Sequence, residues 1–227
     1  MRAELREETG IAVTGDNMEV ARGADVILLG VKPSVVLPVL QETSSALTGK
    51  LVISLAAGIR LSSMEPTGHA RFMRAMTNTP SSIARGATAI APGSRTTNDD
   101  LAAAKAIFSA IGVAVIVDDK HIDAVTALGG SGPAFVYTVI EALAEGAVQE
   151  GLPAEVALTL ATNTVLGAAQ LAAESSLSPD ELRRVVITPG GTTAAGLAAM
   201  EKHGTTKGLI AAVKAAASRG AEMAAGK

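Results

Sequence analysis

The sequence predicts an incomplete α/β domain over residues 1–118, followed by an all-helical domain over residues 119–227. In the first domain, short runs rich in valine, isoleucine and leucine alternate with polar stretches of helical periodicity, which is the pattern of a sheet covered by helices. After Asp119 the short apolar runs cease and only helical stretches follow. With 227 residues, the chain is long enough to give both domains a core.

Five runs in the first domain are strand candidates. They are nearly continuous in apolar, often β-branched residues, which is typical of strands buried on both faces of a parallel sheet. These runs are residues 11–14, 24–30, 51–55, 70–75 and 112–117. The helices expected between them are residues 16–23, 34–47, 61–66 and 97–110. This order predicts a doubly wound, Rossmann-like sheet.

The second domain consists of helical stretches alone. They cover residues 120–127, 133–150, 153–174, 178–186, 192–203 and 205–225. Alanine and glycine are abundant there, and only 2% of the whole chain is aromatic. Helices with such small side chains have little area to bury. We therefore expect this domain to gain a core by packing against a second copy of the chain.

The composition argues against several classes of function. The formal net charge of -3 offers no attraction for nucleic acid or an anionic membrane. Cysteine is absent, and the three histidines are spread too widely to form a metal site. No apolar run reaches the roughly 18 residues of a membrane span, and residues 1–8 read as an exposed charged helix rather than a signal peptide. We expect a soluble cytoplasmic protein that binds no metal, nucleic acid or membrane.

One loop in the helical domain has the features of an anion site. Pro189, Gly190, Gly191, Thr192 and Thr193 stand directly before a helix. Adjacent glycines allow a tight turn in which backbone N–H groups converge at the helix N-terminus, where a carboxylate binds favourably. The alternative is a simple turn in which Thr192 caps the helix.

Several segments of the first domain stand where strand candidates end, at the edge of the sheet where α/β proteins bind ligands. Gly30–Pro33 places a lysine before a rigid proline turn, and Leu55–Gly58 consists mostly of small residues that would admit a flat ring. Asn78 lies in another strand-end loop. Asn17 follows Asp16 at an expected helix start, where a simple N-cap is an equally natural interpretation.

Together and in this order, these motifs resemble the pyrroline-5-carboxylate reductase family. Gly129–Ala134 resembles the family's G-S-G-P-A sequence, which starts its long dimer-forming helix. The resemblance covers the chain from Asp16 to Leu197. It implies reduction of 1-pyrroline-5-carboxylate to L-proline with NADPH or NADH, the last step of proline biosynthesis. It also implies an enzyme that associates with itself as a dimer or larger assembly.

The resemblance further implies roles for individual residues. Thr193 would be catalytic, because its hydroxyl would approach the imine nitrogen. The substrate would contact Gly190, Gly191, Thr192, Thr193, Asp119 and Glu174. The cofactor would contact Asn17, Gly30, Val31, Lys32, Pro33, Leu55, Ala56, Ala57, Gly58 and Asn78. For Asp119, a solvated strand end is the alternative interpretation.

Two further interpretations stay open. A complete nucleotide-binding domain begins with a strand and a G-x-G-x-x-G turn, and neither stands before Ile11. About 40 residues of such a unit are therefore missing, so we expect a truncated start and an unpaired strand. A chain of this kind would be an inactive oligomerisation partner if it held no nucleotide. Another two-domain imine or hydroxyacid reductase is the second alternative, although no lysine base occurs between Lys120 and Lys202.

Overall fold

The structure is a computed structural model that describes residues 2–224. It divides into two compact units, which are described separately. Unit 1 comprises the residues up to Ser131 together with those from Ala215 onward, and unit 2 comprises Gly132–Lys214. Unit 1 contains the α/β sheet and unit 2 is helical, so the predicted fold class is confirmed. The last strand ends at Ile116, close to the predicted change in secondary structure.

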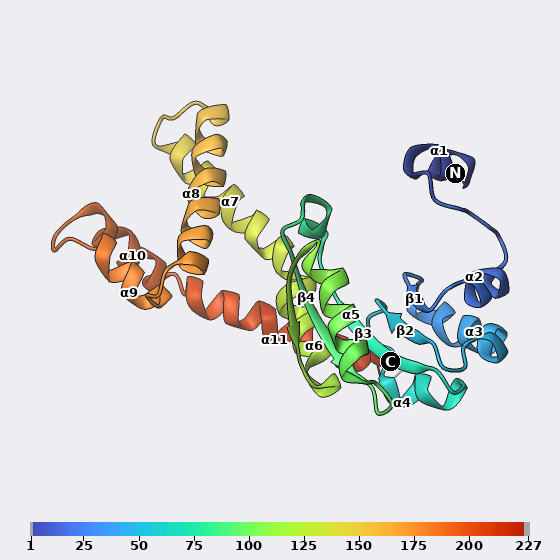
Figure 1. Cartoon of the computed structure of the whole chain (residues 1–227). Coiled ribbons are helices and arrows are strands. Elements are labelled where there is room, and N and C mark those ends of the chain that lie inside the picture. The colour runs from blue at the N-terminus through green and yellow to red at the C-terminus, as the bar shows by residue number, and fades with distance from the viewer. Residues whose placement is uncertain (1, 225–227) are drawn as a thin grey trace. The chain divides into compact units, whose positions relative to one another are not determined.

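Unit 1 is built on a five-stranded sheet with the order β1-β2-β3-β4-β5. The strands are β1 Val26–Leu29, β2 Leu51–Ser54, β3 Arg71–Met76, β4 Gly86–Pro92 and β5 Gly112–Ile116. The pairs β1–β2, β2–β3 and β4–β5 are parallel, whereas β3 and β4 are antiparallel. Among the described residues, β1 has a neighbouring strand on one side only (Figure 1).

Helices cover both faces of this sheet, because successive strand residues point to opposite faces. On one face, Val52 and Phe72 belong to the same buried cluster as residues of α3 (Pro33–Thr43). On the other face, Ile53 clusters with residues of α5 (Asn98–Ser109). The remaining elements of unit 1 are α1 Arg2–Thr9, α2 Asn17–Gly23, α4 Leu61–Met64, α6 Ile122–Val125 and 3₁₀ turns at Ser44–Ala46, Glu65–Thr67, Thr79–Ile83 and Asp119–His121.

Three expectations for the sheet are wrong. Residues 11–14 form no strand, and Ile11 is 54% exposed. The sequence pattern does not predict β4, because small residues dominate its sequence Gly-Ala-Thr-Ala-Ile-Ala-Pro. Its antiparallel pairing with β3 makes the sheet mixed rather than parallel. Close backbone contact also limits side-chain size here, since a Cβ on Gly112 would lie 2.0 Å from the Gly86 carbonyl oxygen.

The helix expected over residues 120–127 is divided into three segments. The 3₁₀ turn Asp119–His121 leads into α6, and the π-helical turn Thr126–Gly130 follows. At the end of this π-turn, the Ser131 N–H donates to the Thr126 carbonyl at 2.9 Å. π-helical turns are rare in proteins, and those that occur often lie at functional sites.

Unit 2 contains α7 and α8, which pack against each other as a hairpin (Figure 1). Its elements are α7 Gly132–Gln149, α8 Ala154–Glu174, α9 Pro179–Val186, α10 Thr192–Lys202 and the first half of α11 Thr205–Ala224. The buried core of the hairpin consists of Ala144, Ala157 and Ala161. These small side chains remove little apolar area from water.

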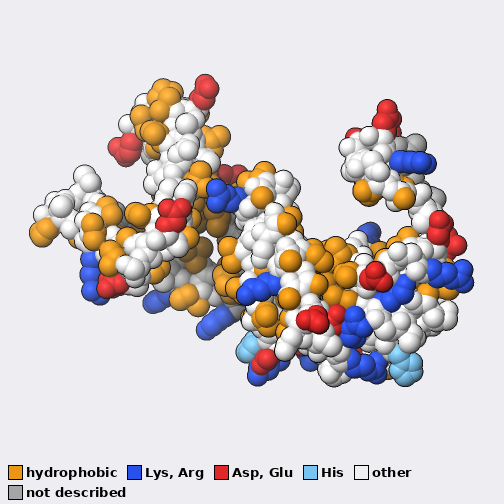
Figure 2. All heavy atoms as spheres, in the orientation of Figure 1, with side chains coloured by type: hydrophobic (Ala, Val, Ile, Leu, Met, Phe, Trp, Pro, Cys, Tyr) orange, Lys and Arg blue, Asp and Glu red, His pale blue; other side chains and the backbone are white. Residues whose placement is uncertain are grey.

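The larger apolar side chains of α8 are exposed. Leu158, Leu160, Leu166 and Leu171 are 51%, 54%, 60% and 57% exposed. Figure 2 shows hydrophobic side chains on the surface of the α7–α8 hairpin. By length and composition alone α8 could cross a membrane, with a mean hydropathy of 1.4, but one such helix is weak evidence, because core helices and signal sequences pass the same test. An exposed apolar surface of this kind marks a site of contact with another molecule.

Candidate functional site

Three of the predicted cofactor residues line one groove in unit 1. Asn17, Gly30 and Val31 border an opening of about 140 Å³ beside β1. The rest of its lining is mostly apolar and comes from α2, α3 and the neighbouring strands. The groove extends to the carboxyl end of β1, which is the edge where α/β sheets bind ligands.

Lys32 and Pro33 begin α3 beside this groove. Pro33 occupies the first turn, and Lys32 is the N-cap residue but its side chain makes no capping hydrogen bond. The Lys32 side chain is exposed. The helix end therefore combines N–H groups without a side-chain cap, the positive end of the helix dipole and a cation. This combination attracts a phosphate group.

Asp16 and Asn17 make different contacts at the start of α2. Asp16 caps the helix by accepting hydrogen bonds from the N–H groups of Met18 and Glu19 at 2.8 and 3.3 Å. The side-chain amide of Asn17 donates to Glu42 at 3.1 Å. The capping interpretation is therefore correct for Asp16, while Asn17 lies at the groove.

The loop after β2 is narrow and nearly free of large side chains. The Leu55 N–H donates to the Leu29 carbonyl at 3.0 Å, which holds the start of the loop beside β1. Ala56 is buried, Ala57 packs against a core cluster, and Gly58 has a φ of 74°. Glycine adopts this left-handed conformation without strain. The loop therefore presents small side chains and a glycine turn at this edge of the sheet.

Asn78 is held firmly at the end of β3. Its side-chain oxygen accepts from the Ala87 N–H at 3.0 Å, and its side-chain nitrogen donates to the Gly129 carbonyl at 3.1 Å. These two bonds connect the β3 end to β4 and to the π-turn. Asn78 therefore fixes three backbone segments at this edge.

Asp119 pairs with the buried Arg74, to which the sequence reasoning gave no role of its own. Asp119 Oδ1 lies 2.7 Å from Arg74 Nη1, and its Oδ2 accepts from the Leu61 N–H at 3.4 Å. The side chain of Arg74 is 2% exposed, and that of Asp119 is 24% exposed. The available signal was an arginine flanked by Met73 and Ala75 inside a strand candidate, because buried charges are rare unless they are paired.

The predicted carboxylate loop lies in unit 2 between α9 and α10. Gly190 has a φ of 74°, and Gly191 is the N-cap of α10. A Cβ on Gly191 would lie 2.2 Å from Thr188 Oγ1, so a side chain at this position would clash with Thr188, which the sequence reasoning did not single out. The alternative of a Thr192 cap is wrong, because Thr192 is already the first residue of the helix. No side chain caps α10, and its first N–H groups, including that of Thr193, face an open helix end.

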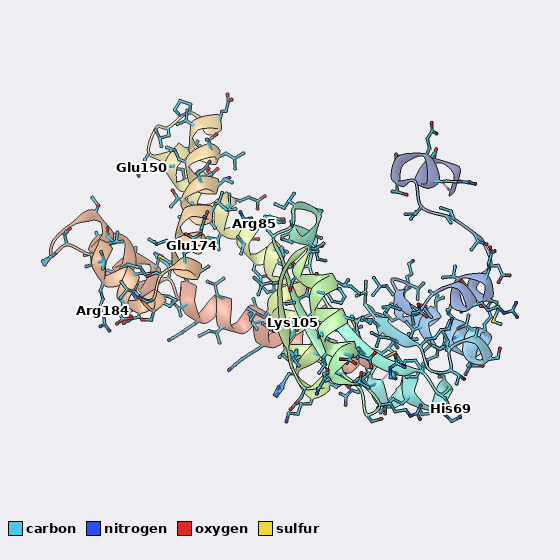
Figure 3. All side chains as sticks on the ribbon, viewed as in Figure 1. His69, Arg85, Lys105, Glu150, Glu174 and Arg184 are labelled. Carbon is cyan, nitrogen blue, oxygen red and sulfur yellow. The ribbon has the colours of Figure 1, made fainter. Side chains whose placement is uncertain are left out.

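Glu174 is the last residue of α8 (Figure 3), and its carboxylate accepts from the Gln170 amide at 2.8 Å. It is exposed and belongs to the same unit as the loop at Gly190. Within residues 2–224, no group of three or more His, Cys, Asp or Glu side chains is arranged to hold a metal ion.

Comparisons with known proteins cover both units. Residues 119–223 match the family described as pyrroline-5-carboxylate reductase dimerisation, and residues 1–58 match the family described as NADP oxidoreductase, coenzyme F420-dependent. A pyrroline-5-carboxylate reductase of Methanosarcina acetivorans is 44% identical over 223 residues, which cover 97% of this chain and 83% of the relative.

Solved structures agree with these sequence matches. A pyrroline-5-carboxylate reductase from Coxiella burnetii aligns with a TM-score of 0.92 and 38% identity, covering 97% of this chain and 84% of the other. The Plasmodium falciparum pyrroline carboxylate reductase, solved with NADP bound, aligns with a TM-score of 0.87 and 30% identity, covering 95% and 83%. The chain therefore belongs to the pyrroline-5-carboxylate reductase family of nicotinamide-dependent oxidoreductases.

Proposed function

We propose that this chain reduces 1-pyrroline-5-carboxylate to L-proline with NADPH or NADH, as the last step of proline biosynthesis in the cytoplasm. The observation that carries the proposal is the uncapped start of α10, where a side chain on Gly191 would displace the Thr188 hydroxyl. Such a helix end binds a carboxylate, and the proposed substrate carries a carboxylate beside its imine.

On the substrate side, the carboxylate accepts hydrogen bonds from the backbone of Gly190, Gly191 and Thr192. Thr193 follows in the first turn of α10, so its hydroxyl lies on the same helix end and steadies the imine nitrogen. A cyclic imine is basic enough to arrive largely as the iminium, so no strong general acid is required. Glu174, in the same unit, adds negative charge that favours this cation.

On the cofactor side, the bound nicotinamide supplies the hydride that reduces the C=N bond. Lys32 and the α3 N-terminus at Pro33 hold its phosphates, and Asn17, Gly30 and Val31 border the groove for the adenosine part. The loop Leu55–Gly58 receives the nicotinamide ring, and Asn78 fixes the neighbouring backbone. An open groove, an uncapped helix start and a loop of small residues together fit a dinucleotide.

We also propose that two copies of the chain pair through the helices of unit 2. The match of residues 119–223 to a dimerisation family supports this pairing. The physical reason lies in α8, whose leucines are about half exposed while its buried contacts are alanines. Covering these leucines with a second copy removes apolar surface from water.

Two adjacent threonines test the substrate site. Thr193→Ala removes a hydroxyl that bonds a charged group, so kcat/KM for 1-pyrroline-5-carboxylate is expected to fall roughly 10- to 100-fold. Thr192→Ala is the matched control, because Thr192 acts through its backbone, and its kcat/KM is expected to change less than about threefold. Steady-state assays with NADPH and with NADH provide these values.

Calorimetry of the wild-type chain with each cofactor gives a separate test of the nucleotide site. We expect binding of NADPH or NADH and its loss in Lys32→Glu, which places a negative charge at the α3 N-terminus. A Thr193→Ala variant with wild-type kcat/KM would remove the catalytic role of Thr193. A wild-type chain that neither binds a nicotinamide cofactor nor reduces the imine would reject the proposed reaction itself.

A further inference from the structure

The ion pair between Arg74 and Asp119 has a geometry that stabilisation alone does not explain. Arg74 lies in the central strand β3, in register with Ser54 of β2 and Ala91 of β4. Its Nη1 bonds Asp119, but its Nε and Nη2 are buried and have no hydrogen-bond partner among the described residues. A buried charge that is only partly paired is costly, and apolar replacements of such pairs are often as stable or more stable.

The pair connects three segments that are distant in the sequence. Leu61 is the first residue of α4, and its N–H donates to Asp119, which stands 58 residues further along the chain. Arg60, the N-cap residue of that helix, makes no capping hydrogen bond with its side chain. Asp119 instead accepts the hydrogen bond from the first N–H of the helix. Asp119 thus joins Arg74 in the sheet to the point where the loop Leu55–Arg60 ends.

A second ion pair joins the end of the same loop to α6, the helix that follows Asp119, and its arginine is exposed. Arg60 Nη2 lies 3.7 Å from Asp123 Oδ2, and the two side chains are 55% and 20% exposed. Ion pairs with such exposure contribute little free energy. This pair is therefore a control for the Arg74–Asp119 pair, because it has the same charges and joins the same loop end to α6, while its arginine is 55% rather than 2% exposed.

We propose that Arg74 and Asp119 are positioning residues that hold the loop Leu55–Arg60 where it receives the nicotinamide ring. The identity of the ring rests on the proposed function, whereas the immobilisation of the loop does not. A charge-assisted bond of 2.7 Å fixes the carboxylate, and the carboxylate fixes the start of α4. In this role Asp119 acts through the loop rather than through the substrate contact that the family resemblance implies.

The test removes both charges of the pair at once. The double variant Arg74→Met with Asp119→Leu is expected to unfold within a few degrees of the wild-type Tm, because it replaces a costly buried pair by apolar side chains. Hydrogen–deuterium exchange of residues 55–61 is expected to accelerate about tenfold or more, because the bond at Leu61 is lost. The control variant Arg60→Met with Asp123→Leu is expected to change this exchange less than about threefold.

Kinetic constants add a readout that a purely structural role would not move. The kcat of the buried-pair variant at saturating cofactor is expected to fall roughly tenfold or more, because small displacements of a reacting ring are costly, while KM for 1-pyrroline-5-carboxylate stays nearly constant. Arg74→Lys keeps a cation opposite Asp119 and is expected to restore part of kcat. If the double variant does not fold, Asp119→Asn keeps the side-chain shape and removes the charge that holds it against Arg74. The exchange of residues 55–61 is then expected to accelerate by less than in the double variant, because the amide oxygen can still accept from the Leu61 N–H.

The outcomes separate the two proposals. Exchange of residues 55–61 at the wild-type rate in the buried-pair variants overturns the positioning role, whatever the activity. Equal acceleration in the exposed-pair control also overturns it. Faster exchange confined to the buried pair supports the positioning role, and it does so even if the wild-type chain reduces no imine, in which case only the proposed reaction fails.

Discussion

The sheet of unit 1 and the α7–α8 hairpin of unit 2 bury apolar surface in opposite ways. Large side chains such as Phe72 and Leu40 are at most 1% exposed in unit 1. In the hairpin the buried residues are alanines, while Leu160 and Leu166 are 54% and 60% exposed. Unit 1 is therefore stabilised by its own contacts, and unit 2 requires a second surface.

Replacing exposed leucines of α8 by glutamate is expected to have the largest effect, on the association of two copies of the chain. Leu160→Glu with Leu166→Glu removes two side chains from the proposed interface, and each occurs twice in a symmetric dimer. With about 1.5–3 kcal/mol for each buried leucine, the expected loss of association free energy is roughly 6 kcal/mol or more. Size-exclusion chromatography with light scattering should show the double variant at the mass of a single chain.

The control for this experiment lies in unit 1. Ile83 is 73% exposed and large, so Ile83→Glu introduces the same charge on an apolar surface residue outside the hairpin. We expect its mass in solution to equal that of the wild type. If the α8 double variant also keeps the wild-type mass, the pairing of copies through α8 is refuted.

Creating a cavity beside the sheet is expected to have the next largest effect, on the stability of unit 1. Phe72→Ala in β3 should lower the free energy of unfolding of unit 1 by about 3–5 kcal/mol. Association should be unchanged, because Phe72 is 1% exposed and packs within unit 1. Urea denaturation measures the loss, and Val113→Ala, at a side chain that is 66% exposed, should cost about 0.5 kcal/mol or less. A change of oligomer mass in Phe72→Ala would break the distinction between the two units.

The sequence predicts the two regions with different success. The helices of unit 2 are recognisable because proline or glycine marks most of their ends. In the sheet, β4 is missed because alanine and threonine fill it, and residues 11–14 are wrongly assigned because Ile-Ala-Val-Thr has strand composition without a partner strand among the described residues. Strand pairing depends on distant segments, which local composition does not encode.

The candidate site shows the same limit. Glycines and small residues mark the loops at Gly58 and Gly190, because backbone conformation restricts the residue types there. The contact between Arg74 and Asp119 spans 45 residues and exists only once the sheet has formed. Local patterns therefore predict where backbone binds a ligand, whereas the side-chain pairs that hold those loops require the fold.

A buried ion pair at the start of α5 makes the stability of unit 1 depend on pH. Asp100 accepts from Arg71 Nε and Nη2 at 2.7 and 3.0 Å, and the bond from Arg71 is the main cause that lowers the pKa of Asp100 below its ordinary value. Because the folded pKa is the lower one, the stabilisation is present above the unfolded pKa of about 3.9 and is lost as pH falls through the folded pKa.

The corresponding measurement compares wild type with Asp100→Asn from pH 7 to pH 3. The wild type is expected to be more stable at pH 7, by less than the effect of Phe72→Ala, and the difference should narrow as pH falls below about 4. Urea denaturation at each pH provides both free energies. A difference that stays constant over this range would show that the Asp100 charge does not stabilise unit 1.

The smallest expected effects on stability come from a capping box that occurs once in each unit. Thr97 with Asp100 begins α5, and Ser178 with Glu181 begins α9, and both are complete capping boxes. The hydroxyls accept the N3 N–H at 3.2 and 3.3 Å, and the acids accept the N-cap N–H at 2.9 and 2.7 Å. Local geometry is thus nearly equal, while Asp100 is 6% exposed and the box at Ser178 is exposed.

Alanine at each cap measures what the surroundings add to this motif. Ser178→Ala should lower the unfolding free energy of unit 2 by roughly 0.5–1 kcal/mol, and Thr97→Ala should lower that of unit 1 by roughly 1–2 kcal/mol. The larger effect is expected at Thr97, because its hydroxyl also bonds the carboxylate that holds Arg71. Urea denaturation of the two variants at pH 7 gives the comparison. Equal losses would mean that burial does not strengthen the motif, and the contrast between the units would then be confined to the size of their core side chains.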